Sequence, residues 1–324
     1  MLRTFSVTGE GIDLAADGRR LPKEAVWVDL LSPSREEEAL VERLLGLAVP
    51  TREDMVEIEP SSRLYQEGGA LHLTASVLAG VHSGEPKSVP VTFLLTRERL
   101  VTVRYDDPKS FQAFISHLGR QPELCRTPAS TLVFLLDAVV ERSADILEEV
   151  AERTDGVSGA IFHREPGPAR RRMTNESLEN ILIEIGGAQE VLSKVRESLS
   201  SMSRLISYLV FMLPQYEEAE VAHLKTVARD VASLTDQAAF MSSNVTFLLD
   251  AALGLINIEQ NAIIKIFSVA AVIFLPPTLV GTVYGMNFDF MPELHWALGY
   301  PFALAMMVVS AVLPYLWFKK KRWL

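Results

Sequence analysis

Cysteine is almost absent from the sequence: Cys125 is the only one among 324 residues, so the chain cannot form an internal disulfide bond. Disulfide bonds are typical of oxidising compartments, and we therefore expect a large part of the chain to be cytoplasmic. The opening stretch, MLRTFSVTGEGIDLAADGRR, lacks the apolar core of a secretory signal peptide, which agrees with that expectation.

Enzyme motifs are missing as well. The sequence contains no P-loop, no H-E-x-x-H and no G-x-S-x-G pattern. We therefore predict that the protein is not an enzyme and holds no organic cofactor. Without an ATP-binding motif, any transport would follow the electrochemical gradient. The net charge of −10 at pH 7 argues against a nucleic-acid partner.

Charge is absent from two long apolar runs near the end of the chain. Ile266–Phe288 has 23 residues and Ala297–Phe318 has 22, all without a formal charge. A helix of about 20 residues crosses a hydrocarbon core of about 30 Å. We therefore predict two transmembrane helices in the lipid bilayer, attached to a soluble part that holds most of the charged residues.

The charges that flank these runs predict the orientation of the two helices across the membrane. The connecting loop carries Asp289 and Glu293 but no lysine or arginine, and a basic cluster follows the second run: Lys319, Lys320, Lys321 and Arg322. Basic flanks stay in the cytoplasm. We therefore expect both termini to be cytoplasmic and the loop to be external, where its carboxylates would attract cations.

The soluble part predicts an α+β domain followed by long helices. Four stretches rich in Val, Leu and Thr read as strands: AVWVDLL, ALHLTASVLAG, VPVTFLL and RLVTVRY. Ser34–Glu37 forms a capping-box pattern. Between Tyr216 and Leu275 there is no proline and one glycine, which favours a single helix of roughly 90 Å. A break near Thr235 and Asp236 would give two shorter helices instead.

The resulting domain prediction has six parts. They are a mixed α/β domain at 1–129, a helical region with a long stalk helix at 130–262, a first transmembrane helix at 263–288, an external loop at 289–296, a second transmembrane helix at 297–318 and a basic tail at 319–324.

A row of polar residues follows one face of the first span. Ser268, Leu275, Thr278 and Thr282 are spaced by seven, three and four residues, and Asn287 ends the row at a Gly-Met-Asn turn. One helix hairpin cannot enclose a water-filled path, so transport would require several copies around an axis. Neutral oxygens suit a hydrated cation such as Mg²⁺, which releases its waters reluctantly. Alternatively, the hydroxyls bond neighbouring helices.

These motifs carry a family resemblance. YGMNF followed by MPEL, a tryptophan and GYP resembles the CorA magnesium transporters, and the ending PYLWFKKKRWL is similar too. NIEQNAIIKIFSVAAVIFLPPTL resembles the proteobacterial branch. The similarity is dense over residues 250–324 and looser upstream, in AVWVDLLSP and EIEPSSRLY.

The resemblance implies a funnel-shaped homopentamer in the bacterial inner membrane that conducts Mg²⁺. It implies a selectivity ring of Gly285, Met286 and Asn287 and a pore lined by Thr282, Thr278, Leu275, Phe267, Ile264 and Asn261, with Phe267 and Ile264 as the hydrophobic constriction. Glu293 would steer cations, and the basic cluster would form a cytoplasmic collar. Mg²⁺ would also regulate the pore by binding between subunits at Asp230, with Glu85 as a candidate partner; an ordinary solvated charge at Asp230 is the alternative.

Other functions stay open at this point. Co²⁺ and Ni²⁺ could pass as mimics of hydrated Mg²⁺. A related zinc transporter is a further alternative, although the polar row holds neither Cys nor His. A membrane-anchored scaffold without transport would explain the spans, but it would not require the polar row.

Overall fold

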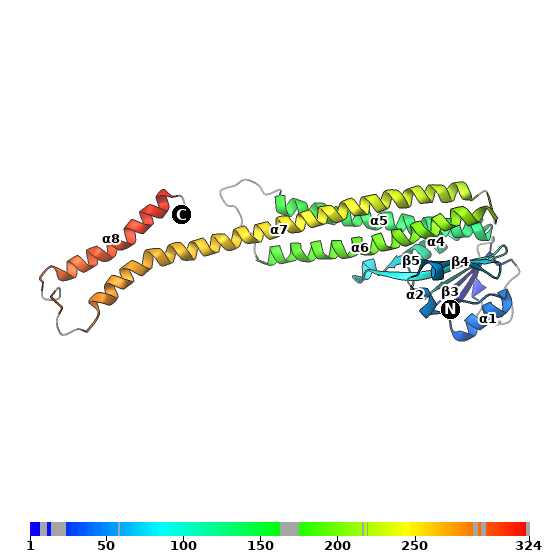
Figure 1. Ribbon diagram of the computed structural model, residues 1–324, viewed down its shortest axis with the longest axis horizontal. Coiled ribbons are helices and arrows are strands. Elements are labelled where there is room, and N and C mark those ends of the chain that lie inside the picture. Colours follow the sequence, from blue (N-terminus) through cyan, green and yellow to red (C-terminus); the bar gives the residue numbers. More distant parts are fainter. Residues whose placement is uncertain are drawn as a thin grey trace. The chain divides into compact units, whose positions relative to one another are not determined.

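The computed structural model describes residues 1–6, 12–13, 24–57, 59–162, 175–215, 217–218, 220–287, 291–292 and 296–321. The chain divides into two compact units. The larger comprises Met1–Glu165 and Glu179–Leu249, and the smaller comprises Pro166–Leu178 and Asp250–Leu324. The chain runs from a sheet-containing part into long helices (Figure 1).

A seven-stranded mixed sheet is the centre of the larger unit. Its strand order is β2-β1-β3-β7-β6-β5-β4, in which only β3 and β7 are parallel. The strands are β1 (Leu2–Phe5), β2 (Ile12–Asp13), β3 (Trp27–Leu31), β4 (Leu64–Glu67), β5 (Ala70–Ala79), β6 (Lys87–Leu95) and β7 (Leu100–Arg104). The four predicted strands are confirmed as β3, β5, β6 and β7.

Helices cover both faces of the sheet. Successive strand residues point to opposite sides, so apolar side chains at neighbouring positions need cover on both faces. On one face, Val28 and Leu30 pack with Val41 of α1 (Arg35–Leu45) and Met55 of α2 (Arg52–Val56). On the other face, Trp27 lies 5.5 Å, ring centre to ring centre, from Phe114 of α4 (Lys109–Leu118). The remaining short helices are α3 (Pro60–Arg63), η2 (Val81–Ser83), η3 (Pro122–Cys125) and η4 (Leu213–Gln215).

The predicted capping box at the start of α1 is confirmed. The Ser34 hydroxyl accepts from the Glu37 backbone N–H at 3.3 Å, and the Glu37 carboxylate accepts from the Ser34 N–H at 2.9 Å. Both bonds satisfy donors that have no partner inside the helix.

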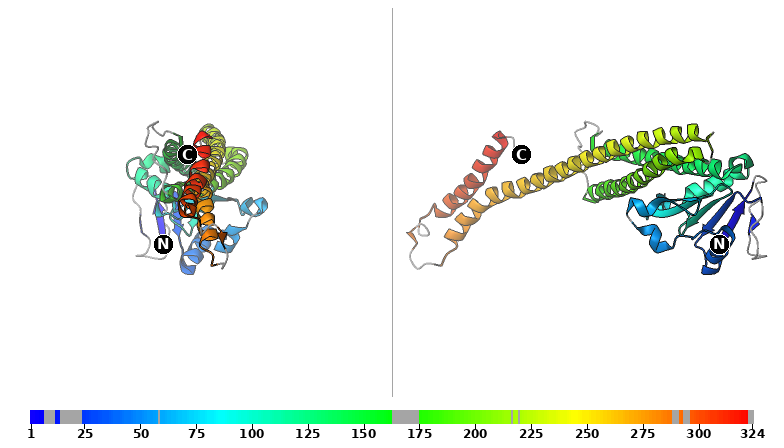
Figure 2. Two further views of the ribbon diagram at one scale, coloured as in Figure 1. Left: turned by 90° about the vertical axis from the view of Figure 1, so that its left-hand side faces the viewer. Right: turned by 45° about the vertical axis from the view of Figure 1, so that its right-hand side comes forward.

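Three long helices run side by side in the larger unit (Figures 1 and 2). They are α5 (Pro128–Phe162), α6 (Asn175–Met212) and the first part of α7 (Val221–Tyr284). The α7 residues that are buried there recur at helical spacing, as Leu224, Val227, Val231, Ala238, Met241, Val245 and Leu248. No break occurs near Thr235, whose hydroxyl donates to the Val231 carbonyl at 2.7 Å, so the single long helix is confirmed.

Two serines attach α6 to the sheet. β4 pairs with β5 only as far as Leu73, which leaves the backbone of Ser76 without a strand on that side. The Ser76 N–H donates to the Ser201 hydroxyl at 3.0 Å, and its carbonyl accepts from the Ser198 hydroxyl at 2.9 Å. The helix therefore satisfies part of an edge that would otherwise be unpaired.

A buried ion pair joins the two parallel strands. Arg104 donates to both carboxylate oxygens of Asp29, at 3.0 and 2.7 Å, and the two side chains are 1% and 0% exposed. Thr102 donates to Asp29 at 2.7 Å and accepts from the Trp27 indole at 3.0 Å. Burial disfavours the charge of Arg104, but Asp29 and Asp107 outweigh it and hold the pKa of Arg104 above its usual value.

Removal of one partner tests how far the larger unit depends on this pair. Asp29→Ala would leave a guanidinium buried without its carboxylate, so we expect the free energy of unfolding to fall by about 3–5 kcal/mol. Denaturant unfolding of the full chain measures the change. The control is Glu197→Ala, which removes a 52% exposed carboxylate 3.5 Å from Lys194 and should cost less than about 1 kcal/mol. Similar losses in both variants would contradict a special role for Asp29.

Candidate ion pathway

The end of α7 and the helix α8 (Gly299–Lys320) form the apolar part of the smaller unit. Both helices are long and apolar enough to cross a membrane, with mean hydropathies of 2.2 and 1.8 over their most apolar windows. Only 6% and 11% of those windows are buried within the chain. A core helix of a soluble protein would be mostly buried, so this surface is left for lipid or for further copies of the chain.

One stripe of each helix is the less exposed one. On α8 it consists of Gly299, Ala303, Met306, Met307, Ser310, Ala311, Pro314 and Phe318. On α7 the corresponding stripe consists of Ala262, Lys265, Val269, Ala270, Ile273, Pro276, Pro277, Val280, Gly281 and Tyr284. A side chain at Gly281 would lie 3.2 Å from the Met307 methyl group, which shows how close the two helices come. Around Gly281 and Met307, these stripes are therefore where α7 and α8 meet.

The predicted polar row lies on a different face of α7. Asn261, Ile264, Phe267, Ser268, Leu275, Thr278 and Thr282 are all exposed in the single chain. The apolar members are strongly exposed, with Ile264 at 61%, Phe267 at 72% and Leu275 at 66%. The structure thus brings these residues to one surface that α8 leaves uncovered. Ser310 of the second span, in contrast, is half-buried and donates to the Met307 carbonyl.

The two threonine hydroxyls of the row use their hydrogens within the helix. Thr278 donates to the Phe274 carbonyl at 2.7 Å, and Thr282 donates to the Thr278 carbonyl at 2.8 Å. A hydroxyl that donates in this way keeps its oxygen lone pairs for other donors. The row can therefore accept hydrogen bonds from the water molecules around a cation.

Two prolines lie within the same segment of α7. Pro276 and Pro277 have no N–H, so the carbonyls of Val272 and Ile273 lose the bond that an α-helix normally gives them. An unsatisfied carbonyl costs several kcal/mol in lipid. Water or a neighbouring helix near these carbonyls would remove that cost.

The Gly-Met-Asn turn begins directly where α7 ends. The Gly285 N–H donates to the carbonyls of Gly281 at 2.9 Å and Thr282 at 3.2 Å, and the Met286 N–H donates to Val283 at 3.3 Å. A Cβ atom at Gly285 would lie 3.1 Å from the Gly281 oxygen, so a larger residue would strain the turn. Met286 and Asn287 follow as exposed residues.

Three predicted charged residues, Asp289, Glu293 and Arg322, lie outside the described residues. The lysines of the basic cluster are exposed at the end of α8. Lys321 places its ammonium group 5.7 Å from the centre of the Trp317 ring, a cation–π distance.

The two proposed regulatory carboxylates lie in the larger unit. Asp230 is exposed on α7, and Glu85 is exposed in the turn between β5 and β6. Within the described ranges, no group of three or more His, Cys, Asp or Glu side chains could hold a metal ion.

Comparisons with known proteins agree with the family resemblance that the sequence motifs carry. The family described as "CorA-like Mg2+ transporter protein" matches residues 22–320. A relative from Sodalis glossinidius, named magnesium transport protein CorA, is 33% identical over 100% of both chains. A protein of the same name from Wolinella succinogenes is 34% identical over 92% of this chain and 91% of its own.

Solved structures share the fold. The complete CorA magnesium transporter from Methanocaldococcus jannaschii has a TM-score of 0.75 at 18% identity, covering 100% of this chain and 98% of its own. The full-length CmaX protein has a TM-score of 0.71 at 16% identity, covering 99% and 97%. The predicted CorA-like fold is confirmed, and the family is one of transporters and not of enzymes. The chain belongs to the family of CorA-like Mg²⁺ transporter proteins.

Proposed function

We propose that the protein is a passive channel for hydrated Mg²⁺, built from several copies whose α7 helices surround a common axis. The observation that carries this proposal is the uncovered face of α7, where the threonines, Asn261 and large apolar residues share one surface. Relatives over most or all of the chain are named magnesium transport proteins. A pentamer is the ring size that the family resemblance implies.

Selection takes place at the Gly-Met-Asn turn. Asn287 offers a neutral amide oxygen, and a ring of such oxygens can accept hydrogen bonds from the water shell without removing it. Thr282 and Thr278 continue the path, and Leu275, Phe267 and Ile264 make its narrow apolar part. Co²⁺ and Ni²⁺ pass where their hydrated ions match Mg²⁺ in size.

The protein lies in the bacterial inner membrane with both termini in the cytoplasm. Lys319, Lys320 and Lys321 mark the inner side, and Asp289 and Glu293 concentrate cations at the outer entrance. An inside-negative potential drives Mg²⁺ inward. In the cytoplasm, Mg²⁺ at Asp230, between neighbouring copies and with Glu85 as a candidate partner, closes the channel.

Two alternatives have less support. A zinc pathway would favour nitrogen and sulfur ligands, and the row on α7 has neither Cys nor His. A non-transporting anchor would need no polar row, and membership in a transporter family argues against it.

A cysteine scan tests whether the uncovered face lines water. In a Cys125→Ser background, we introduce Leu275→Cys, Thr278→Cys and Thr282→Cys on the row, with Ile273→Cys and Val280→Cys on the stripe next to α8 as controls. We expect a membrane-impermeant thiol reagent to modify the row positions faster, because only a hydrated path exposes them. Uniform protection at all five positions would support an anchor instead.

Ion flux tests the selectivity ring. In proteoliposomes with an inside-negative potential and an internal Mg²⁺ indicator, we expect Asn287→Ala to reduce flux by about tenfold or more. Each copy would lose an amide whose hydrogen bonds contribute about 0.5–1.5 kcal/mol. The control Ser310→Ala removes a hydroxyl on the stripe that faces α7 and should leave flux near the wild-type rate. Equal flux in wild type and Asn287→Ala would place selection elsewhere.

Limited proteolysis tests the regulatory site. Mg²⁺ that bridges copies would reduce the repulsion between chains of charge −10, so we expect slower cleavage of the wild-type protein when Mg²⁺ is present. Asp230→Asn should lose most of this protection, whereas Asp236→Asn, an exposed carboxylate on the same helix, should keep it. Protection that is the same in all three proteins would remove Asp230 from the site.

A further inference from the structure

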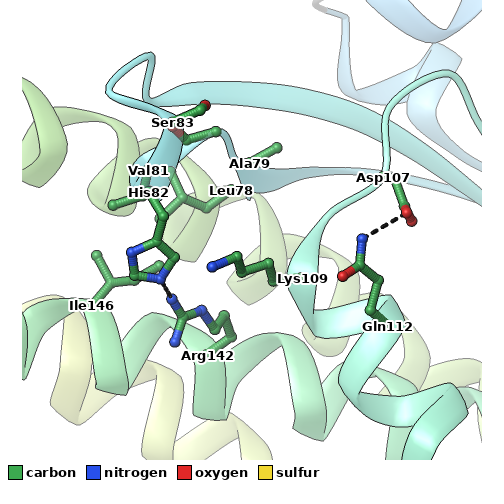
Figure 3. Close-up of a pocket in the computed structure, with 11 residues that line it drawn as sticks. Leu78, Ala79, Val81, His82, Ser83, Asp107, Lys109, Gln112, Arg142 and Ile146 are labelled. Atoms are coloured by element: carbon green, nitrogen blue, oxygen red, sulfur yellow. Dashed lines mark hydrogen bonds between the residues drawn. The ribbon is translucent and has the colours of Figure 1, made fainter.

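A cavity of about 210 Å³ lies in the larger unit, beside the β5–β6 turn (Figure 3). Leu78 and Ile146 form part of an apolar wall. Three basic side chains line it from three different elements: His82 from η2, Lys109 from the start of α4, and Arg142 from the middle of α5. Residues that are far apart in the sequence thus place nitrogen atoms around one small space.

Lys109 is the group whose charge is not compensated. Its side chain extends into the cavity between His82 and Asp107 (Figure 3), and in the described part of the chain it makes no hydrogen bond or ion pair. The nearby Asp107 is already bound by Arg104, and it accepts from the Gln112 amide at 2.7 Å. Asp107 also lines the cavity, but its carboxylate is held by Arg104 and Gln112 and makes no ion pair with Lys109.

Arg142 and His82 are in direct contact. The Nε2 atom of His82 lies against the Arg142 guanidinium, and a carboxylate oxygen of Glu149 is 3.7 Å from the same nitrogen. Arg142 also pairs with Asp145 at 3.1 Å and with Glu149 at 3.6 Å. These carboxylates keep the guanidinium beside the cavity and partly neutralise its positive charge.

The N-terminus of α4 adds a weaker positive electrostatic potential at the cavity. Lys109 is the first residue of this ten-residue helix, and no side chain caps its N-terminus. Uncapped N–H groups and the helix dipole favour an anion at this end.

We propose that this cavity binds a small phosphate-type oxyanion, either inorganic phosphate or the terminal phosphate of a nucleotide. Ammonium and guanidinium groups give strong charge-assisted bonds to such oxygens. The volume of about 210 Å³ suits a group of this size, since pockets that enclose drug-sized ligands measure about 300–1,000 Å³.

The bound anion would also contact the turn that carries Glu85, because His82 belongs to that turn and lines the cavity. In this turn the Gly80 carbonyl accepts from the Glu85 N–H at 3.1 Å and from the Ser83 hydroxyl at 2.8 Å. Gly80 has a φ of +75°, and a Cβ atom there would lie 2.1 Å from the Glu85 oxygen. This link to Mg²⁺ regulation rests on the proposed function, whereas anion binding does not.

Calorimetric titration of the full chain in detergent tests the site, with Mg²⁺ absent and ionic strength constant. One arm uses sodium phosphate and the other uses ATP. We expect Lys109→Gln to weaken binding by about tenfold or more, because a bond to a charged group is worth about 1.5–3 kcal/mol. Lys109→Arg should retain binding. The matched control is Lys87→Gln, since Lys87 pairs with Asp106 and does not line the cavity.

The two arms identify the source of the anion. Lys109-dependent binding of phosphate assigns the cavity to the free anion, and Lys109-dependent binding of ATP alone assigns it to a nucleotide phosphate. No binding of either compound by the wild type would overturn the proposal. Equal weakening in Lys109→Gln and Lys87→Gln would overturn it as well, since that result indicates general charge attraction. Neither outcome depends on Mg²⁺ flux.

Discussion

Two antiparallel helices can cover only one face of each other, and this constraint governs the membrane part of the protein. The stripe of α7 that includes Val269 and Val280 meets α8, which leaves the row from Asn261 to Thr282 uncovered. Lipid gives no hydrogen bond to the carbonyls before Pro276 and Pro277. In the proposed channel, a second copy of the chain, or water held between copies, would remove that cost.

The chemistry of the row follows from the same constraint. Thr278 and Thr282 donate to carbonyls of their own helix, so their oxygens face outward as acceptors. A carboxylate at these positions would bind a bare divalent ion strongly and hold it in place. Neutral acceptors instead bond to the water shell, which suits an ion that keeps its waters. Formal charge is found outside the row, in the carboxylates of the loop and the lysines at the end of α8.

Local patterns allowed much of the fold to be predicted. Strands β3, β5, β6 and β7, the capping box at Ser34 and the length of α7 all depend on signals carried by neighbouring residues. The strands β1, β2 and β4 were missed because they are short, with two to four residues each. The pairing of Asp29 with Arg104 and the cavity beside Lys109 could not be predicted, since each joins segments that only tertiary folding brings together.

For the pathway, periodicity predicted which residues share a face, but only the structure identified the face that α8 leaves uncovered.

The fold alone does not select an ion. CorA from Methanocaldococcus jannaschii and CmaX share this architecture with 18% and 16% identical residues, so the scaffold persists while most side chains change. What distinguishes members must therefore be sought in individual side chains, and in the proposed function these are the residues on the uncovered face of α7 and at its Gly-Met-Asn end. Gly285 is one of these positions: a Cβ atom there would approach the Gly281 oxygen to 3.1 Å, so a larger residue would have to shift the turn before Asn287 by a few tenths of an ångström. In the proposed channel, this short turn at the end of one helix, repeated around an axis, would decide which hydrated ion enters.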